Sequence, residues 1–131
     1  MKTHAFRLCP GQDLRLEIEQ CAREYKITAG TILSCVGNLK KVVMRMADAA
    51  VVKTYDGSFE IVSLVGTLEA GNSHLHIAIS DKDGITHGGH LKPGSIIGIT
   101  AEVIIAELEG IMFTREKDDE TGYDELMISS I

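Results

Sequence analysis

Three histidines in the middle of the chain have the residue type and the spacing of a metal site. His74 and His76 are separated by one residue, and His90 follows a pair of glycines at 88–89. If Leu75 marks the buried side of a β-strand, the first two histidines share the opposite face, with Cα atoms roughly 6.5 Å apart. Three imidazoles that leave a fourth position open for water or substrate are a ligand set of zinc. The sequence therefore predicts a divalent metal, with zinc favoured, at His74, His76 and His90.

The histidine pair also fits two half-exposed polar residues of an amphipathic strand. The face of His90 depends on the turn expected at residues 83–84, an Asp-Gly pair. A loop of two or four residues places His90 on the wrong face, whereas a loop of odd length, or a bulge at residues 88–89, brings it across from His76. His90 could also belong to a loop or meet the pair across a subunit boundary. His87 has no place in this pattern, and we expect it to be an exposed strand or loop residue.

The elements that position these histidines are expected to be strands and one helix. Apolar residues recur at helical spacing from Leu14 to Tyr25, behind Asp13, which can cap the helix. Most of the remaining chain is rich in β-branched residues and broken by turn residues, so the fold class is α+β: a curved, largely antiparallel sheet with a barrel-like core and one main amphipathic helix. The expected strands cover residues 3–8, 31–36, 41–46, 51–55, 58–68, 74–79, 86–91, 95–106 and 126–128. The expected turns are Gly37-Asn38, Asp56-Gly57, Asp83-Gly84 and Pro93-Gly94, and residues 117–125 are expected to form a solvated loop.

Length and charge limit the function classes. A chain of 131 residues has the length of one ordinary domain, expected to cover residues 1–131. Thirteen basic against nineteen acidic residues give a formal net charge of −6, and the densest basic group is only Lys40, Lys41 and Arg45. Binding to nucleic acid through phosphate neutralisation needs several such residues on one face, so direct DNA binding is not expected.

Cysteine usage and hydropathy predict a cytoplasmic protein. Cys9, Cys21 and Cys35 are odd in number and lie in apolar surroundings without Cys-x-x-Cys spacing, which is typical of reduced core residues. The N-terminus turns polar too early for a signal peptide, and no apolar run approaches the roughly 18 residues needed to span a membrane.

Longer motifs resemble a known family. The run Gly-Ser-Phe-Glu-Ile-Val-Ser-Leu-Val-Gly-Thr-Leu at residues 57–68, the Ser-His-Leu-His at 73–76 and the Gly-Gly-His-Leu at 88–91 resemble the signature of the PPC family, the "plants and prokaryotes conserved" domain. The resemblance extends from the first strand to Leu108. It implies an α+β fold assembled as a homotrimer, found alone in prokaryotes and fused to AT-hook segments in plant nuclear proteins. Several prokaryotic relatives carry a metal at the histidine cluster, which corresponds here to His74, His76 and His90.

The chain departs from the plant pattern at two points. Plant members usually have Arg in a Gly-Arg-Phe-Glu-Ile run where this chain has Ser58, and no Arg-Gly-Arg-Pro core of an AT-hook occurs. That core is the element which enters an A·T minor groove in the fused proteins. The DNA-binding label of the family therefore rests on association for this chain.

Two main function classes follow from these residues. The first is an assembly and regulatory module: a trimer with a structural or ligand-sensing metal and with protein partners, which could link it to DNA-associated complexes. Val62, Leu64 and residues 95–106 support assembly, because they supply more apolar surface than one helix can cover. The second is a metal-dependent, hydrolase-like enzyme, in which zinc lowers the pKa of a bound water toward roughly 7 and Glu60 or Glu102 is the candidate base. A direct DNA-binding protein is a further, less favoured alternative. No phosphate-binding loop, Ser-His-Asp grouping or nicotinamide fingerprint is present.

Overall fold

A curved antiparallel sheet dominates the computed structural model, which describes residues 1–131. Six strands form this sheet in the order β1-β6-β2-β3-β4-β5, and β7 and β8 form a separate hairpin. The elements are β1 (Lys2–Leu8), α1 (Leu14–Glu24), β2 (Gly30–Arg45), the short 3-10 helix η1 (Ala47–Ala49), β3 (Val52–Glu69), β4 (Asn72–Ser80), β5 (Thr86–Leu91), β6 (Ile96–Glu107), β7 (Ile111–Lys117) and β8 (Asp124–Ser130).

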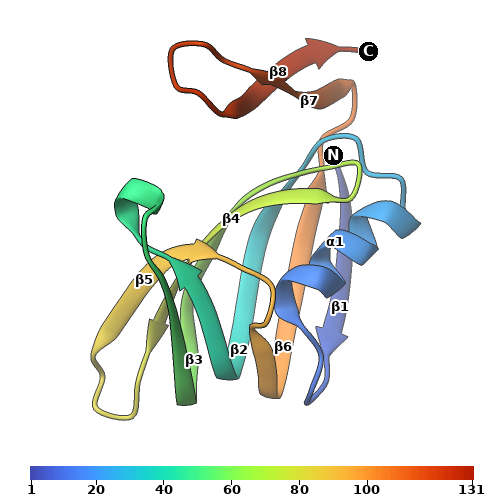
Figure 1. Cartoon of the computed structure of the whole chain (residues 1–131). Helices are drawn as coiled ribbons and strands as arrows, with labels where there is room; N and C mark the ends of the chain where they lie inside the picture. The colour runs from blue at the N-terminus through green and yellow to red at the C-terminus, as the bar shows by residue number, and fades with distance from the viewer.

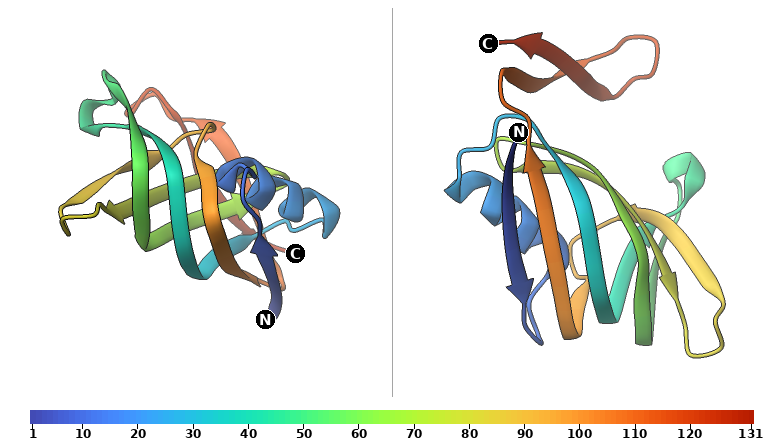
Figure 2. Two further views of the ribbon diagram at one scale, coloured as in Figure 1. Left: turned by 90° about the horizontal axis from the view of Figure 1, so that it is seen from below. Right: turned by 180° about the vertical axis from the view of Figure 1, so that it is seen from behind.

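The sheet curls into a partial ring, as the view from below in Figure 2 shows. Strand β2 pairs with β3 along one edge, while its other edge pairs first with β6 and then, at its end, with β5. The register places Met44 opposite Leu91 and Arg45 opposite His90. Because this last pairing returns the sheet to β2, strands β2 to β5 form a closed ring of neighbours. The predicted α+β class with a barrel-like core is confirmed.

The helix lies at one side of the curled sheet, beside β1 and β6 (Figure 1). Asp13 caps α1, since its side chain accepts a hydrogen bond from the Leu16 N–H at 3.0 Å. The helix contacts β3, β4 and β6, and it buries the apolar stripe of Leu14, Ile18, Cys21 and Ala22 against the sheet. The inward residues of β4, including Leu75, are fully buried in the same core. Neither helix is long and apolar enough to cross a membrane.

Two predicted turns are wrong, because the chain continues through them as strand. Residues 37–38 lie within β2, and residues 56–57 lie within β3. At Gly37 a Cβ atom would lie 2.1 Å from the Thr100 carbonyl oxygen, so the glycine permits two backbones to approach closely. Register shifts between Gly37 and Lys41 bend the strand there. These glycines therefore lie where long strands bend, and the chain does not reverse direction at them.

The C-terminal hairpin was only partly predicted. Strand β8 was expected at residues 126–128, but its partner β7 was not. The loop that joins the two covers residues 118–123 and is shorter than the solvated loop expected at 117–125, because both strands extend into that range. The hairpin stands apart from the end of the main sheet in Figure 1. An ion pair attaches it, since Arg115 Nε lies 2.8 Å from Glu69 Oε1 on β3.

Candidate metal centre

The loop between β4 and β5 decides which face His90 occupies. The last pair of the ladder is Ser80 with Thr86, so the loop has five residues, 81–85, and the odd length brings His90 directly opposite His76. The register runs unbroken through Gly88 and Gly89, so no bulge contributes. The odd length of the loop, and not a bulge, therefore places His90 on the same face as His76.

Asp81 holds this loop in shape. Its Oδ1 atom accepts hydrogen bonds from the backbone N–H groups of Asp83 at 2.9 Å and Ile85 at 3.0 Å. These bonds, with the Ile85 N–H as the largest cause, and the contact with His87 lower the pKa of the Asp81 carboxyl. His87 Nε2 lies 3.3 Å from Asp81 Oδ2, and its ring packs on Tyr55 with centroids 4.9 Å apart. His87 therefore supports the loop and lies outside the metal-ligand group.

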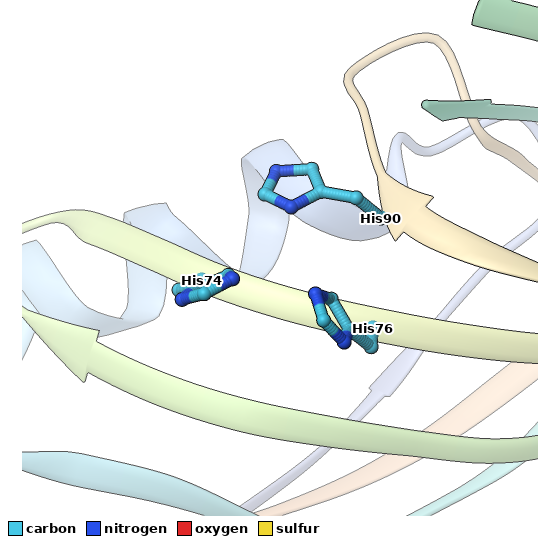
Figure 3. A group of neighbouring side chains, drawn as sticks. All are labelled: His74, His76 and His90. Carbon is cyan, nitrogen blue, oxygen red and sulfur yellow. The ribbon is translucent and has the colours of Figure 1, made fainter. Parts of the chain in front are cut away.

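The rings of the three candidate ligands converge on one place (Figure 3). Their ring centroids lie 5.0 to 5.6 Å apart, and one nitrogen from each of His74, His76 and His90 lies within 4.8 Å of the others. In a tetrahedral zinc site with bonds of 2.0–2.1 Å, ligand nitrogens are about 3.3 Å apart, which small rotations of the rings can reach. The three histidines form a group that could hold a metal ion.

Electrostatics favours the form of histidine that binds metals. Partial burial, and then the charges of Arg45 and of neighbouring groups, lower the pKa of His90 to about 4. Partial burial, followed by the nearby His76, also lowers the pKa of His74. Both rings are therefore neutral at pH 7, with lone pairs available for a cation. The buried Nδ1 atom of His90 has no hydrogen-bond partner in the chain, which fits an atom that has a ligand to bind.

The two larger cavities beside the histidines are open. A cavity of about 850 Å³ has His76 and His90 in its wall, and a second of about 520 Å³ has His74 and His90. Arg45 and Tyr123 line both. Tyr123 comes from the loop of the β7–β8 hairpin, so the hairpin contributes to the surroundings of the cluster.

The carboxylates near the histidines differ from those singled out in the sequence. Glu60 and Glu102 are exposed and line neither cavity. Glu69 lines the smaller cavity, is 4% exposed, and keeps its Oε2 atom without a partner. No local spacing indicated it, because Glu69 reaches the site through the pairing of β3 with β4. The ion pair with Arg115 explains why the Glu69 carboxylate can be buried. Because Arg115 is 46 residues further along the chain, no local motif shows this pair.

The fold and this cluster define a class of protein: a small α+β domain, built on a partial β-ring, with three histidines on adjacent strands that could hold a metal ion. The family model of the Plants and Prokaryotes Conserved (PCC) domain matches residues 1–109, and the chain belongs to this family. The resemblance noted in the sequence is thereby confirmed. The β7–β8 hairpin lies beyond the matched residues.

Individual relatives match all or nearly all of the chain. It is 40% identical over 131 residues to the bifunctional protein GlmU of a Synechococcus strain, of which it spans 21% of the length. A solved structure from Salmonella enterica is 39% identical with a TM-score of 0.95, covering 98% of this chain and 94% of that one. A structure described as a metal-containing protein of Archaeoglobus fulgidus is 30% identical with a TM-score of 0.83, covering 97% and 94%.

Proposed function

We propose that this chain binds one divalent ion, zinc, through His74, His76 and His90. The observation that carries the proposal is the convergence of three ring nitrogens within 4.8 Å, two of them on histidines with a lowered pKa. The relative from Archaeoglobus fulgidus, described as metal-containing, supports it. Zinc with three histidine ligands keeps a fourth position open, where it can act as a Lewis acid or bind a ligand.

The role that we favour is an assembly and regulatory module that works as a homotrimer with protein partners. Exposed apolar side chains on three neighbouring strands support assembly, and we call this surface the apolar face. They lie on β2, β3 and β6 and are Leu33, Val36, Val62, Val65, Ile99 and Ile104. Leu64, which the sequence assigned to this surplus, is a core residue. Val65 pairs with His76, so a neighbouring subunit on this face would lie beside the histidines.

The GlmU relatives fit the same role. There, a sequence like this chain makes up 21% of a longer bifunctional protein. Because a similar sequence is joined to other parts of a longer chain in GlmU, we propose that this chain works together with separate protein partners. We place the protein in the cytoplasm, since its three thiols are unpaired, with Cys21 and Cys35 buried and Cys9, contrary to expectation, exposed.

A metal-dependent, hydrolase-like enzyme is the second candidate. The open cavities beside the histidines favour it, because they leave space for a substrate. Of the three carboxylates in the wall of the smaller cavity, Glu69 is the buried one, and its unpartnered Oε2 atom is the candidate to accept a proton. Zinc-dependent turnover of ester or phosphoester substrates, lost in Glu69→Gln with metal content unchanged, would favour this candidate over the module.

Elemental analysis of untagged protein tests the metal proposal. We expect one zinc per chain in the wild type and in His87→Gln, a control that removes a neighbouring histidine outside the cluster, and none in His76→Ala. Zinc retained in His76→Ala would overturn the assignment. Sedimentation at micromolar concentration tests the trimer, and a monomer would show that the apolar face has no partner copy.

Direct binding to duplex DNA is not part of the proposal. The net charge of −6 repels a polyanion, and Arg45 lies in the wall of the histidine cavities. We expect no shift of an A·T-rich duplex by the assembled protein at ~150 mM salt. A shift of the duplex at sub-micromolar protein concentration would show that the chain binds DNA directly and would contradict this expectation.

A further inference from the structure

Arg45 is a positively charged side chain beside the histidines that has no ionic partner in the chain. Arg45 lies opposite His90 in the pairing that closes the ring, is half-buried, and lines both cavities. Its guanidinium forms no hydrogen bond or ion pair within the chain. The two other arginines of the smaller cavity do: Arg15 Nε lies 3.3 Å from Glu19 Oε2, and Arg115 Nε lies 2.8 Å from Glu69 Oε1.

An unpaired guanidinium is unfavourable beside a group that binds a cation. Its charge repels a divalent ion, and partial burial reduces the screening by water. The smaller cavity offsets that ion only in part, because its three arginines face four carboxylates: Glu69, Asp124 and Glu125 in the lining, and Glu19 as the partner of Arg15. A bound dication therefore leaves the cavity with a net formal charge of about +1, in a chain whose total is −6. A negatively charged ligand would relieve both costs.

We infer that Arg45 recognises the carboxylate of a small organic acid that binds in the cavity beside the histidine cluster. The inference deepens the proposed function and rests on it. A carboxylate matches the planar fork of a guanidinium with two parallel hydrogen bonds, and its oxygens are also accepted by zinc. The cavity of about 520 Å³ suits a small molecule, and the polar side chains of Asn72 and Tyr123 in its lining can donate hydrogen bonds.

Cobalt-loaded protein provides the test, because the visible spectrum of Co²⁺ changes when the ligands around it change. Acetate, glycolate and succinate are titrated into the wild type, with inorganic phosphate as the comparison anion. The variants are Arg45→Gln, which removes the charge, and Arg45→Lys, which keeps the charge without the fork. Arg7→Gln is the control, since Arg7 is exposed on β1, bonds to Thr100 Oγ1 and lines neither histidine cavity.

Two opposite effects are expected in Arg45→Gln. Affinity for the carboxylates falls at least about tenfold, as for the loss of a charged hydrogen-bond pair, while affinity for Co²⁺ is unchanged or rises because a repelling charge is gone. The carboxylate affinity of Arg45→Lys should lie between those of the wild type and Arg45→Gln. Both affinities of Arg7→Gln should equal those of the wild type. A merely structural role for Arg45 would lower both affinities together.

The outcomes separate this inference from the metal proposal. Wild-type protein that binds Co²⁺ at the histidines but shows no response to any carboxylate, or responds to phosphate alone, overturns the inference and leaves the metal site standing. Equal carboxylate affinity in the wild type and Arg45→Gln also overturns it. Failure of the wild type to take up Co²⁺ or zinc overturns the proposed function first and removes the basis of this one.

Discussion

Replacing Arg115 with methionine should expose the energetic cost of the carboxylate in the cavity wall. Glu69 has a side chain only 5% exposed, and Arg115 is its one ionic partner. Arg115 also donates to Thr67 Oγ1 at 3.2 Å. Removing one partner of a buried pair costs roughly 3–5 kcal/mol, because the other charge is left uncompensated. The Arg115 side chain is 21% exposed, so water can partly replace it, and we expect a loss of about 3 kcal/mol.

Urea denaturation measures the global loss, and amide hydrogen exchange measures the local one. If the hairpin detaches before the domain unfolds, the global loss is limited to the free energy of docking, and β7 and β8 lose protection instead. The matched control is Lys117→Met on the same strand, where an exposed lysine without a partner should change stability by less than about 0.5 kcal/mol.

The double variant Glu69→Gln/Arg115→Met separates the pair from simple loss of packing. It should be less destabilised than Arg115→Met alone, since no charge is then left buried. A loss below about 1 kcal/mol in Arg115→Met together with unchanged protection of the hairpin would refute the reasoning. So would a double variant whose loss equals the sum of the two single losses.

Two further predictions concern the histidines. Deleting Lys82 makes the loop even in length and should abolish zinc binding, whereas deleting residues 82–83 restores odd length and should retain it; stoichiometry measured by elemental analysis decides. The metal-free protein should lose stability as the pH falls from about 6.5 toward 4, because the lowered pKa values of His90 and His74 make the unfolded chain bind more protons there. Urea midpoints across that range test this, and a flat profile, or an unchanged slope in His90→Gln, would contradict it.

The strand that carries two of the candidate ligands could be predicted from the sequence alone. Alternation of apolar residues with His74 and His76 fixed their common face, and the structure agrees. The face of His90 could not be determined, because it depends on the parity of the loop. That parity follows from the hydrogen bonds of Asp81, which no apolar pattern records.

The full length of strands β2 and β3 could not be predicted from local sequence patterns either. A glycine next to an asparagine is typical of a turn, but Gly37 lies where Thr100 of a neighbouring strand approaches too closely for a side chain. Only tertiary packing separates these two uses of glycine.

The charged surroundings of the histidines depend on tertiary structure even more strongly. Arg45, Glu69 and Arg115 come from β2, β3 and β7 and share no spacing in the sequence. They meet because the ring closes and the hairpin docks.

X-ray absorption at the zinc edge tests the central claim most directly, because it reports the atoms bound to the metal. For zinc-loaded wild-type protein we predict three imidazole nitrogens and one further light ligand at roughly 2.0–2.1 Å. The imidazole signal should fall in His76→Ala and remain in His87→Gln. A sulfur ligand at about 2.3 Å, or a shell of oxygens without imidazole, would contradict the assignment of His74, His76 and His90 as the metal site.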